Sequence, residues 1–215
     1  MSGAIFELFG SWSAVLRLVG SVVFAGVAIK LMDDYLDRDM DVLAGRRTVA
    51  AGIGAGTIAY ALAALTVGML LDPRTAGPLF LASYALGMGH EPGRRLPSGL
   101  AAWQESFLAV LAGCPLAGTR RMVGALLAMV VVQCVDDLMD LAGDRRRGHR
   151  SWAVRLGEVE TGLLAAAALL TGLALTPVLL VVVVAAAILI EVLFRRAARL
   201  LPAVGESVGE GATEP

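Results

Sequence analysis

The residues of this chain that could do chemistry are mainly its aspartates. Nine of the ten lie in two clusters, Asp33–Asp41 and Asp136–Asp144, and both clusters follow the pattern D-D-x-x-D-x-x-x-D. On a helix, residues at i, i+3, i+4 and i+7 share one face, and four residues rise by roughly 6 Å. The spacing therefore predicts two carboxylate stripes. They are formed by Asp34, Asp37 and Asp41, and by Asp137, Asp140 and Asp144.

Adjacent carboxylates repel one another and take up protons unless a cation neutralises them. Hard oxygen ligands suit Mg²⁺, which keeps several waters and shares phosphate oxygens with a substrate. The clusters contain no histidine or cysteine, which disfavours zinc. We expect a diphosphate held between the two stripes by two or more Mg²⁺ ions. Asp39 lies off the first stripe and is expected to be a solvated residue at a helix end.

The elements that carry these clusters are predicted to be membrane helices. Hydrophobic residues make up 57% of the chain, only 17% are charged, and the mean hydropathy is +0.74, values well above those of a soluble domain. Few residues are aromatic, which favours helices over a barrel. We predict an all-α, polytopic membrane bundle in one domain, residues 1–201, followed by a disordered tail, 202–215. Its seven helices would span about 11–33, 48–71, 75–89, 99–117, 121–139, 158–174 and 177–194.

The distribution of basic residues supports this count. If the seven helices cross alternately, fourteen Lys and Arg residues fall on one side, and only Arg17, Arg74, Arg120 and Arg121 fall on the other. Such an asymmetry distinguishes cytoplasmic from external ends. We expect an integral protein of the cell membrane, with its N-terminus outside and both aspartate clusters facing the cytoplasm. The net charge of −1 gives no indication of a nucleic-acid partner.

The residues around the clusters resemble those of a known family. Lys30–Asp41 is similar to the N-D-x-x-D-x-x-x-D motif of the UbiA superfamily of intramembrane prenyltransferases. The second cluster continues through Gly148, Ser151 and Ala153 to Gly157, which resembles that family's D-x-x-x-D motif and its K-x-G-K-x-T/S-x-A-V-R-x-G segment. The similarity is closest to the menaquinone-pathway branch, whose second motif begins N-N-x-x-D. Tyr84 with Arg94-Arg95 loosely resembles the family's Y-S-x-x-P-x-R-x-K loop.

The resemblance implies a role for each matching residue. The Mg²⁺ ligands would be Asp33, Asp34, Asp37, Asp41, Asp136, Asp137, Asp140 and Asp144, of which Asp34, Asp37, Asp140 and Asp144 would be catalytic. The diphosphate would contact Lys30, Arg46, Arg47, Arg94, Arg95 and Arg150, since a guanidinium suits phosphate oxygens. These arginines could equally be anchors at the cytoplasmic face. Candidates for contact with an acceptor are Asp33, Gln104 and Glu105, although Glu105 could instead lie at the end of a helix in water.

The sequence also departs from the family. Acids stand at Asp33, Asp136 and Asp137, where the family usually has asparagine, and seven helices replace the usual nine. The first and last helices of the family would be missing, so a second copy of the chain could complete one wall of the site.

Three functions are compatible with this pattern. The first is Mg²⁺-dependent transfer of a prenyl group from a prenyl diphosphate to a small lipophilic acceptor, an aromatic compound or quinone precursor, within the membrane lipid. The second is a UbiA-type terpene cyclase that ionises the diphosphate without an external acceptor. The third is a non-catalytic membrane protein that binds lipid.

Overall fold

A computed structural model describes residues 2–38, 45, 47–90, 92–148 and 151–200, and this part of the chain is helical without a β-strand. Each of the seven ranges expected to be helical contains a helix, although only five of them are long and apolar enough to be membrane spans, and the second is split by a 3-10 turn, η1 (Gly54–Gly56). Asp41, Arg46, Arg150 and the tail 202–215 lie outside the described residues. The helices are α1 (Ser2–Leu36), α3 (Val49–Ile53), α4 (Thr57–Leu71), α5 (Pro73–Gly87), α6 (Ala102–Ala117), α7 (Thr119–Arg147), α8 (Trp152–Leu156), α9 (Glu158–Leu175) and α10 (Pro177–Leu200).

Five segments are long and apolar enough to cross a membrane: Trp12–Leu36, Val49–Leu71, Thr119–Arg146, Glu158–Leu175 and Pro177–Leu200. Large apolar side chains are exposed on their outer faces; Leu70 is 81% exposed and Leu170 is 68% exposed. A water-soluble protein rarely exposes so much apolar surface, whereas lipid accepts it. These helices support an integral membrane protein. The helices α5 and α6 are shorter, at 15 and 16 residues.

Three helices are longer than the sequence predicts by more than five residues, and one of them, α10, continues past residue 194 to Leu200. The helix α1 begins at Ser2 rather than near residue 11, and α7 continues past residue 139 to Arg147. Gly148 ends α7 in the left-handed conformation, with φ of 69°, a conformation that glycine adopts without a Cβ clash. The predicted boundary near 139 was wrong because aspartates, although polar, do not stop a helix whose earlier turns are packed. The second aspartate cluster is therefore helical throughout.

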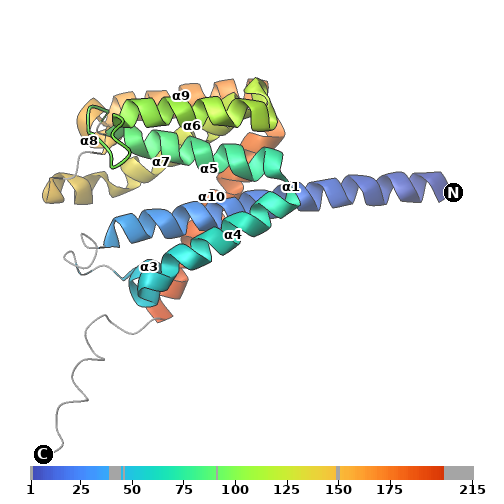
Figure 1. Ribbon diagram of the computed structural model, residues 1–215, viewed down its shortest axis with the longest axis horizontal. Coiled ribbons are helices and arrows are strands. Elements are labelled where there is room, and N and C mark those ends of the chain that lie inside the picture. The colour runs from blue at the N-terminus through green and yellow to red at the C-terminus, as the bar shows by residue number, and fades with distance from the viewer. Residues whose placement is uncertain (1, 39–44, 46, 91, 149–150, 201–215) are drawn as a thin grey trace, which may run out of the picture.

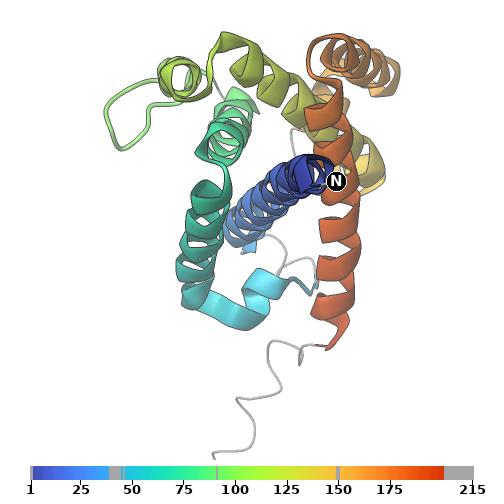
Figure 2. The ribbon, with the colours of Figure 1, turned by 90° about the vertical axis from the view of Figure 1, so that its right-hand side faces the viewer.

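The long helices run in alternating directions along the chain (Figure 1). Seen from the end that carries the N-terminus, α1 passes through the middle of the molecule and the other helices curve around it (Figure 2). It packs against α4, α5 and α10, while α7 packs against α5, α6, α9 and α10. The helices α5 and α10 therefore connect the two helices that carry the aspartate clusters.

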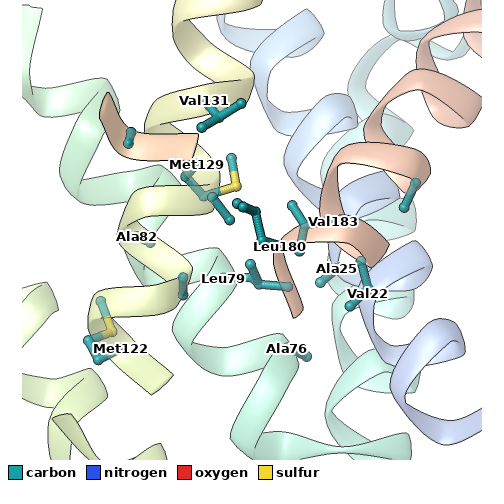
Figure 3. Packing of buried hydrophobic residues seen from close by; sticks show 14 residues of the cluster. Val22, Ala25, Ala76, Leu79, Ala82, Met122, Met129, Val131, Leu180 and Val183 are labelled. Atoms are coloured by element: carbon teal, nitrogen blue, oxygen red, sulfur yellow. The ribbon is translucent and has the colours of Figure 1, made fainter. Parts of the chain in front are cut away.

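The core between these helices is built largely from small side chains. In Figure 3, Leu79, Met129, Leu180 and Val183 converge from α5, α7 and α10. Seven of the fourteen residues in this cluster are alanine. Small residues let helix backbones approach closely, which is the main source of helix association in lipid. At Gly68 the backbones of α4 and α1 approach one another closely, because an added Cβ would lie 3.2 Å from the carbonyl oxygen of Ser21 on α1.

We expect Gly68→Leu to destabilise the bundle. Its side chain would meet the backbone of α1, which cannot move aside as a flexible side chain can, and overpacking of this kind typically costs about 1–3 kcal/mol. The matched control is Gly162→Leu on α9, where nothing lies within 4 Å of an added Cβ. Thermal denaturation in detergent should show a lower midpoint for Gly68→Leu only. Equal midpoints for the two variants would contradict the close packing of α1 on α4.

Candidate functional site

The helices α1 and α7 end on the same side of the molecule, opposite the N-terminus (Figure 1). We call this side the motif end, and define it by the termini of α1 at Leu36 and of α7 at Arg147. The carboxylates of Asp33 and Asp136 are close enough to interact electrostatically, although they belong to different clusters. The fold therefore brings the two clusters together, as expected from an even number of helices between them.

The aspartates differ in their exposure to solvent. Asp34, Asp137 and Asp144 are buried, with exposed fractions of 8%, 6% and 6%. Asp136 and Asp140 are half-buried. Asp33 and Asp37 are exposed, and Asp37 lies just past the end of α1, where its N–H donates to the carbonyl of Asp33 over 3.0 Å. The clusters thus present both buried and accessible carboxylates.

Lys30 is the cation at the centre of this arrangement. Its Nζ lies 3.2 Å from Oδ1 of Asp34, one turn later on α1, and 3.2 Å from Oε2 of Glu191 on α10. It also interacts electrostatically with Asp33 and Asp136. One ammonium group therefore connects α1 with α10 and lies within electrostatic reach of the α7 cluster. This position fits the expectation that Lys30 partly neutralises the aspartates.

Sequence reasoning missed Glu191 and Arg195 as members of this cluster. Glu191 forms a second ion pair, with Arg195 one turn later on α10, and Arg195 interacts electrostatically with Asp136 and Asp140. A signal was present in the sequence, because Glu191 is the one charged residue between Pro177 and Phe194. An ionisable residue within such an apolar run indicates a functional site in membrane proteins.

Asp137 has two hydrogen-bond partners. Nε2 of Gln133 donates to its Oδ1 over 2.8 Å, and the backbone N–H of Trp152 donates to its Oδ2 over 2.6 Å. Asp137 therefore joins α7 to the first residue of α8. Neither hydrogen bond was foreseen from the sequence.

The arginines proposed for phosphate contact that can be placed are exposed, whereas Lys30 is half-buried. Arg47 precedes α3, while Arg94 and Arg95 lie in the connection between α5 and α6. The backbone of this connection is held by several hydrogen bonds, among them one in which the N–H of Ala102 donates to the carbonyl of Arg94 over 2.9 Å. Their guanidinium groups are accessible to an anion at the motif end.

The two acceptor candidates on α6 make local contacts instead. Oε1 of Gln104 accepts the N–H of Ala101 over 2.9 Å at the start of the helix. Glu105 accepts hydrogen bonds from the hydroxyls of Tyr84 and Ser98. Its carboxylate thereby ties the connection that carries Arg94 and Arg95 to both α5 and α6.

The groups that could bind a metal at the motif end suit a hard cation, because they are the carboxylate oxygens of aspartates on α1 and α7. Within the described part of the chain, no three His, Cys, Asp or Glu side chains form a group that could hold a metal ion by themselves. Mg²⁺ usually binds through one or two carboxylates, with water and substrate phosphates completing its coordination. A site of that kind would use one or two of these carboxylates and not an all-protein cage.

Compared with protein-family models, curated proteins and solved structures, the chain matches none of them. The function must therefore be argued from the residues and their arrangement.

We expect the ion pair between Lys30 and Glu191 to couple α1 to α10. Lys30→Met leaves Glu191 and Asp34 without this cation, and Glu191→Gln leaves Lys30 with its ion pair to Asp34. The double variant removes both charges, so its loss of stability should be smaller than the sum of the two single losses, by about 0.5–3 kcal/mol. Wild type, the two single variants and the double variant form a double-mutant cycle, and thermal denaturation in detergent measures the stability of each. Arg196→Gln, at an exposed position on α10, is the control. Additive losses would show that the two groups are not coupled.

The contacts of Glu105 predict a change in proteolysis. Tyr84→Phe or Ser98→Ala removes one hydrogen bond, worth about 1 kcal/mol, so trypsin should cut after Arg94 or Arg95 about 5-fold faster. Tyr60→Phe, which removes the same hydroxyl from the exposed face of α4, is the matched control. Cleavage rates unchanged from wild type in both variants would mean that Glu105 does not restrain this connection.

Proposed function

We propose that this chain is a UbiA-type intramembrane prenyltransferase, which transfers a prenyl group from a prenyl diphosphate to a small lipophilic acceptor, an aromatic compound or quinone precursor. The observation that carries the proposal is the meeting of two D-D-x-x-D-x-x-x-D clusters at one end of α1 and α7. A single acidic patch at a helix end is common. Two patches of identical spacing, brought together around one lysine at the edge of an apolar bundle, favour a site for a cation and a phosphate.

The proposed topology has seven crossings, with α5 and α6 added to the five long segments. The two added helices, α5 and α6, would each extend about 22–24 Å, which is less than the hydrocarbon thickness of a bilayer, about 30 Å. A bilayer thins locally around short helices at modest cost. The basic residues support this arrangement, because they gather where helices that run toward the motif end finish. Arg94 and Arg95 follow α5, and Arg145, Arg195 and Arg199 lie near the C-terminal ends of α7 and α10. The motif end would then face the cytoplasm, with the N-terminus outside the cell.

The residues have distinct roles in the proposed reaction. Asp34, Asp37, Asp140 and Asp144 would hold Mg²⁺, and Asp33 and Asp136 would lie beside it. Bound Mg²⁺ supplies charge that stabilises the diphosphate as a leaving group. Lys30, Arg94 and Arg95 would contact phosphate oxygens as their negative charge increases, which lowers the barrier to breaking the allylic C–O bond. The apolar side chains of the bundle would exclude water from the prenyl group until the acceptor attacks.

The decisive experiment is incubation of the detergent-purified protein with Mg²⁺ and geranyl, farnesyl or geranylgeranyl diphosphate, with and without quinone precursors. Mass spectrometry identifies the products. Release of diphosphate that requires an acceptor would support prenyl transfer. Release without an acceptor, together with a cyclic hydrocarbon or alcohol, would support the cyclase instead. Absence of Mg²⁺-dependent turnover with every chain length would support a non-catalytic lipid-binding protein.

We expect Asp34→Ala and Asp140→Ala each to reduce turnover by about 10²-fold or more, a loss typical of removing an electrostatic contact to a transition state. Asp39→Ala is the control, because Asp39 lies off the predicted stripe. The measurement is diphosphate release at saturating Mg²⁺. Full activity of Asp140→Ala would refute the assignment of the second cluster.

A further inference from the structure

Asp137 of the second cluster is held by two hydrogen bonds. It is 6% exposed, and each of its carboxylate oxygens accepts a hydrogen bond, Oδ1 from Gln133 over 2.8 Å and Oδ2 from the backbone N–H of Trp152 over 2.6 Å. Hydrogen bonds to an ionised carboxylate are shorter and stronger than those between neutral groups. The orientation of this carboxylate is therefore fixed by the protein itself.

Trp152, whose N–H donates to Asp137, also makes a second contact. Trp152 is the first residue of α8, and its ring lies against η2 (Met88–His90), since a Cβ added to Gly89 would be 3.6 Å from its Cζ2. The residues on either side of Trp152 are enclosed, with Ser151 1% exposed and Ala153 fully buried. Trp152 thus connects α7, through its N–H, to the turn that follows α5, through its ring.

These contacts lead us to propose that Asp137 is a positioning residue and not a magnesium ligand, which refines the role of the second cluster within the proposed function. Its carboxylate holds the start of α8 on α7 and, through Trp152, fixes α8 against η2. A carboxylate oxygen that accepts a hydrogen bond keeps a second lone pair, but both oxygens of Asp137 are oriented by donors of the protein, which sets the carboxylate for the contact with α8 rather than for an ion. Asp140 and Asp144, one and two turns later on α7, retain the proposed role in Mg²⁺ binding.

The proposal is tested by Asp137→Asn, which preserves shape and removes charge. The amide oxygen still accepts the N–H of Trp152, and the amide nitrogen can donate to Oε1 of Gln133 once the Gln133 amide turns over. Asp137→Ala removes both contacts. Trypsin cleavage after Arg155 in detergent should be about 10-fold faster for Asp137→Ala, because α8 opens more often, and within about 2-fold of wild type for Asp137→Asn. Trypsin sensitivity of Asp137→Asn equal to that of Asp137→Ala would overturn the proposal.

A second measurement separates positioning from metal binding. In the presence of inorganic pyrophosphate, added Mg²⁺ should shift the thermal midpoint of the protein. The Mg²⁺ concentration that gives half of this shift, the half-point, should agree within about 2-fold between Asp137→Asn and wild type. Asp140→Asn is the matched comparison, and its half-point should rise by about 10-fold or more. A rise of that size in Asp137→Asn would make Asp137 a ligand and refute the proposal. If wild type shows no Mg²⁺ shift, the proposed function fails, while the trypsin comparison still decides whether Asp137 positions α8.

Discussion

The organisation of this protein depends on the cost of placing many carboxylates at the ends of apolar helices. Ionised groups in a medium of low dielectric constant are stable only with opposite charges or hydrogen-bond donors close to them. The two clusters meet beside the core of the bundle, so each buried carboxylate there needs such a partner. Lys30 supplies a cation to Asp34, and Gln133 and Trp152 supply donors to Asp137. The positions of α8 and α10 follow from these requirements.

The central position of α1 makes this possible. Because α1 runs through the middle of the bundle (Figure 2), its last turns can face α7 and α10 together. Close packing at Gly68 on α4 and at Ala25 and Ala76 in the core brings the neighbouring helices near enough to fix its position. Since packing in lipid depends on shape rather than on exclusion of water, small residues here determine where the charged end of α1 lies.

The sequence was sufficient to predict which segments are helical and that the two clusters meet at one end of the bundle. Long apolar runs predict helices directly, and an even number of them between Asp34 and Asp140 predicts a shared end. It was not sufficient for the partners of individual carboxylates. Lys30 and Glu191 are 161 residues apart (191 − 30), so their ion pair depends on how α10 packs against α1. The bond from Trp152 to Asp137 depends on a turn after α7, and no local pattern specifies such a contact. The placement of Glu105 with Tyr84 and Ser98 likewise arises from the packing of α5 on α6.

The charge balance of the assembled site gives the strongest reason to expect a divalent cation. Seven aspartates of the two clusters can be placed in the structure, and Glu191 makes eight acidic groups; within the same network, Lys30 and Arg195 contribute two positive charges. The formal excess is therefore six negative charges (8 − 2) when all these groups are ionised. A diphosphate would be repelled from such a surface, and the exposed arginines nearby are screened by water and salt. Either the accessible carboxylates take up protons or cations bind among them, and only the second outcome makes the site attractive to a phosphate. The acidic clusters are thus the feature on which the proposed metal-bridged diphosphate rests.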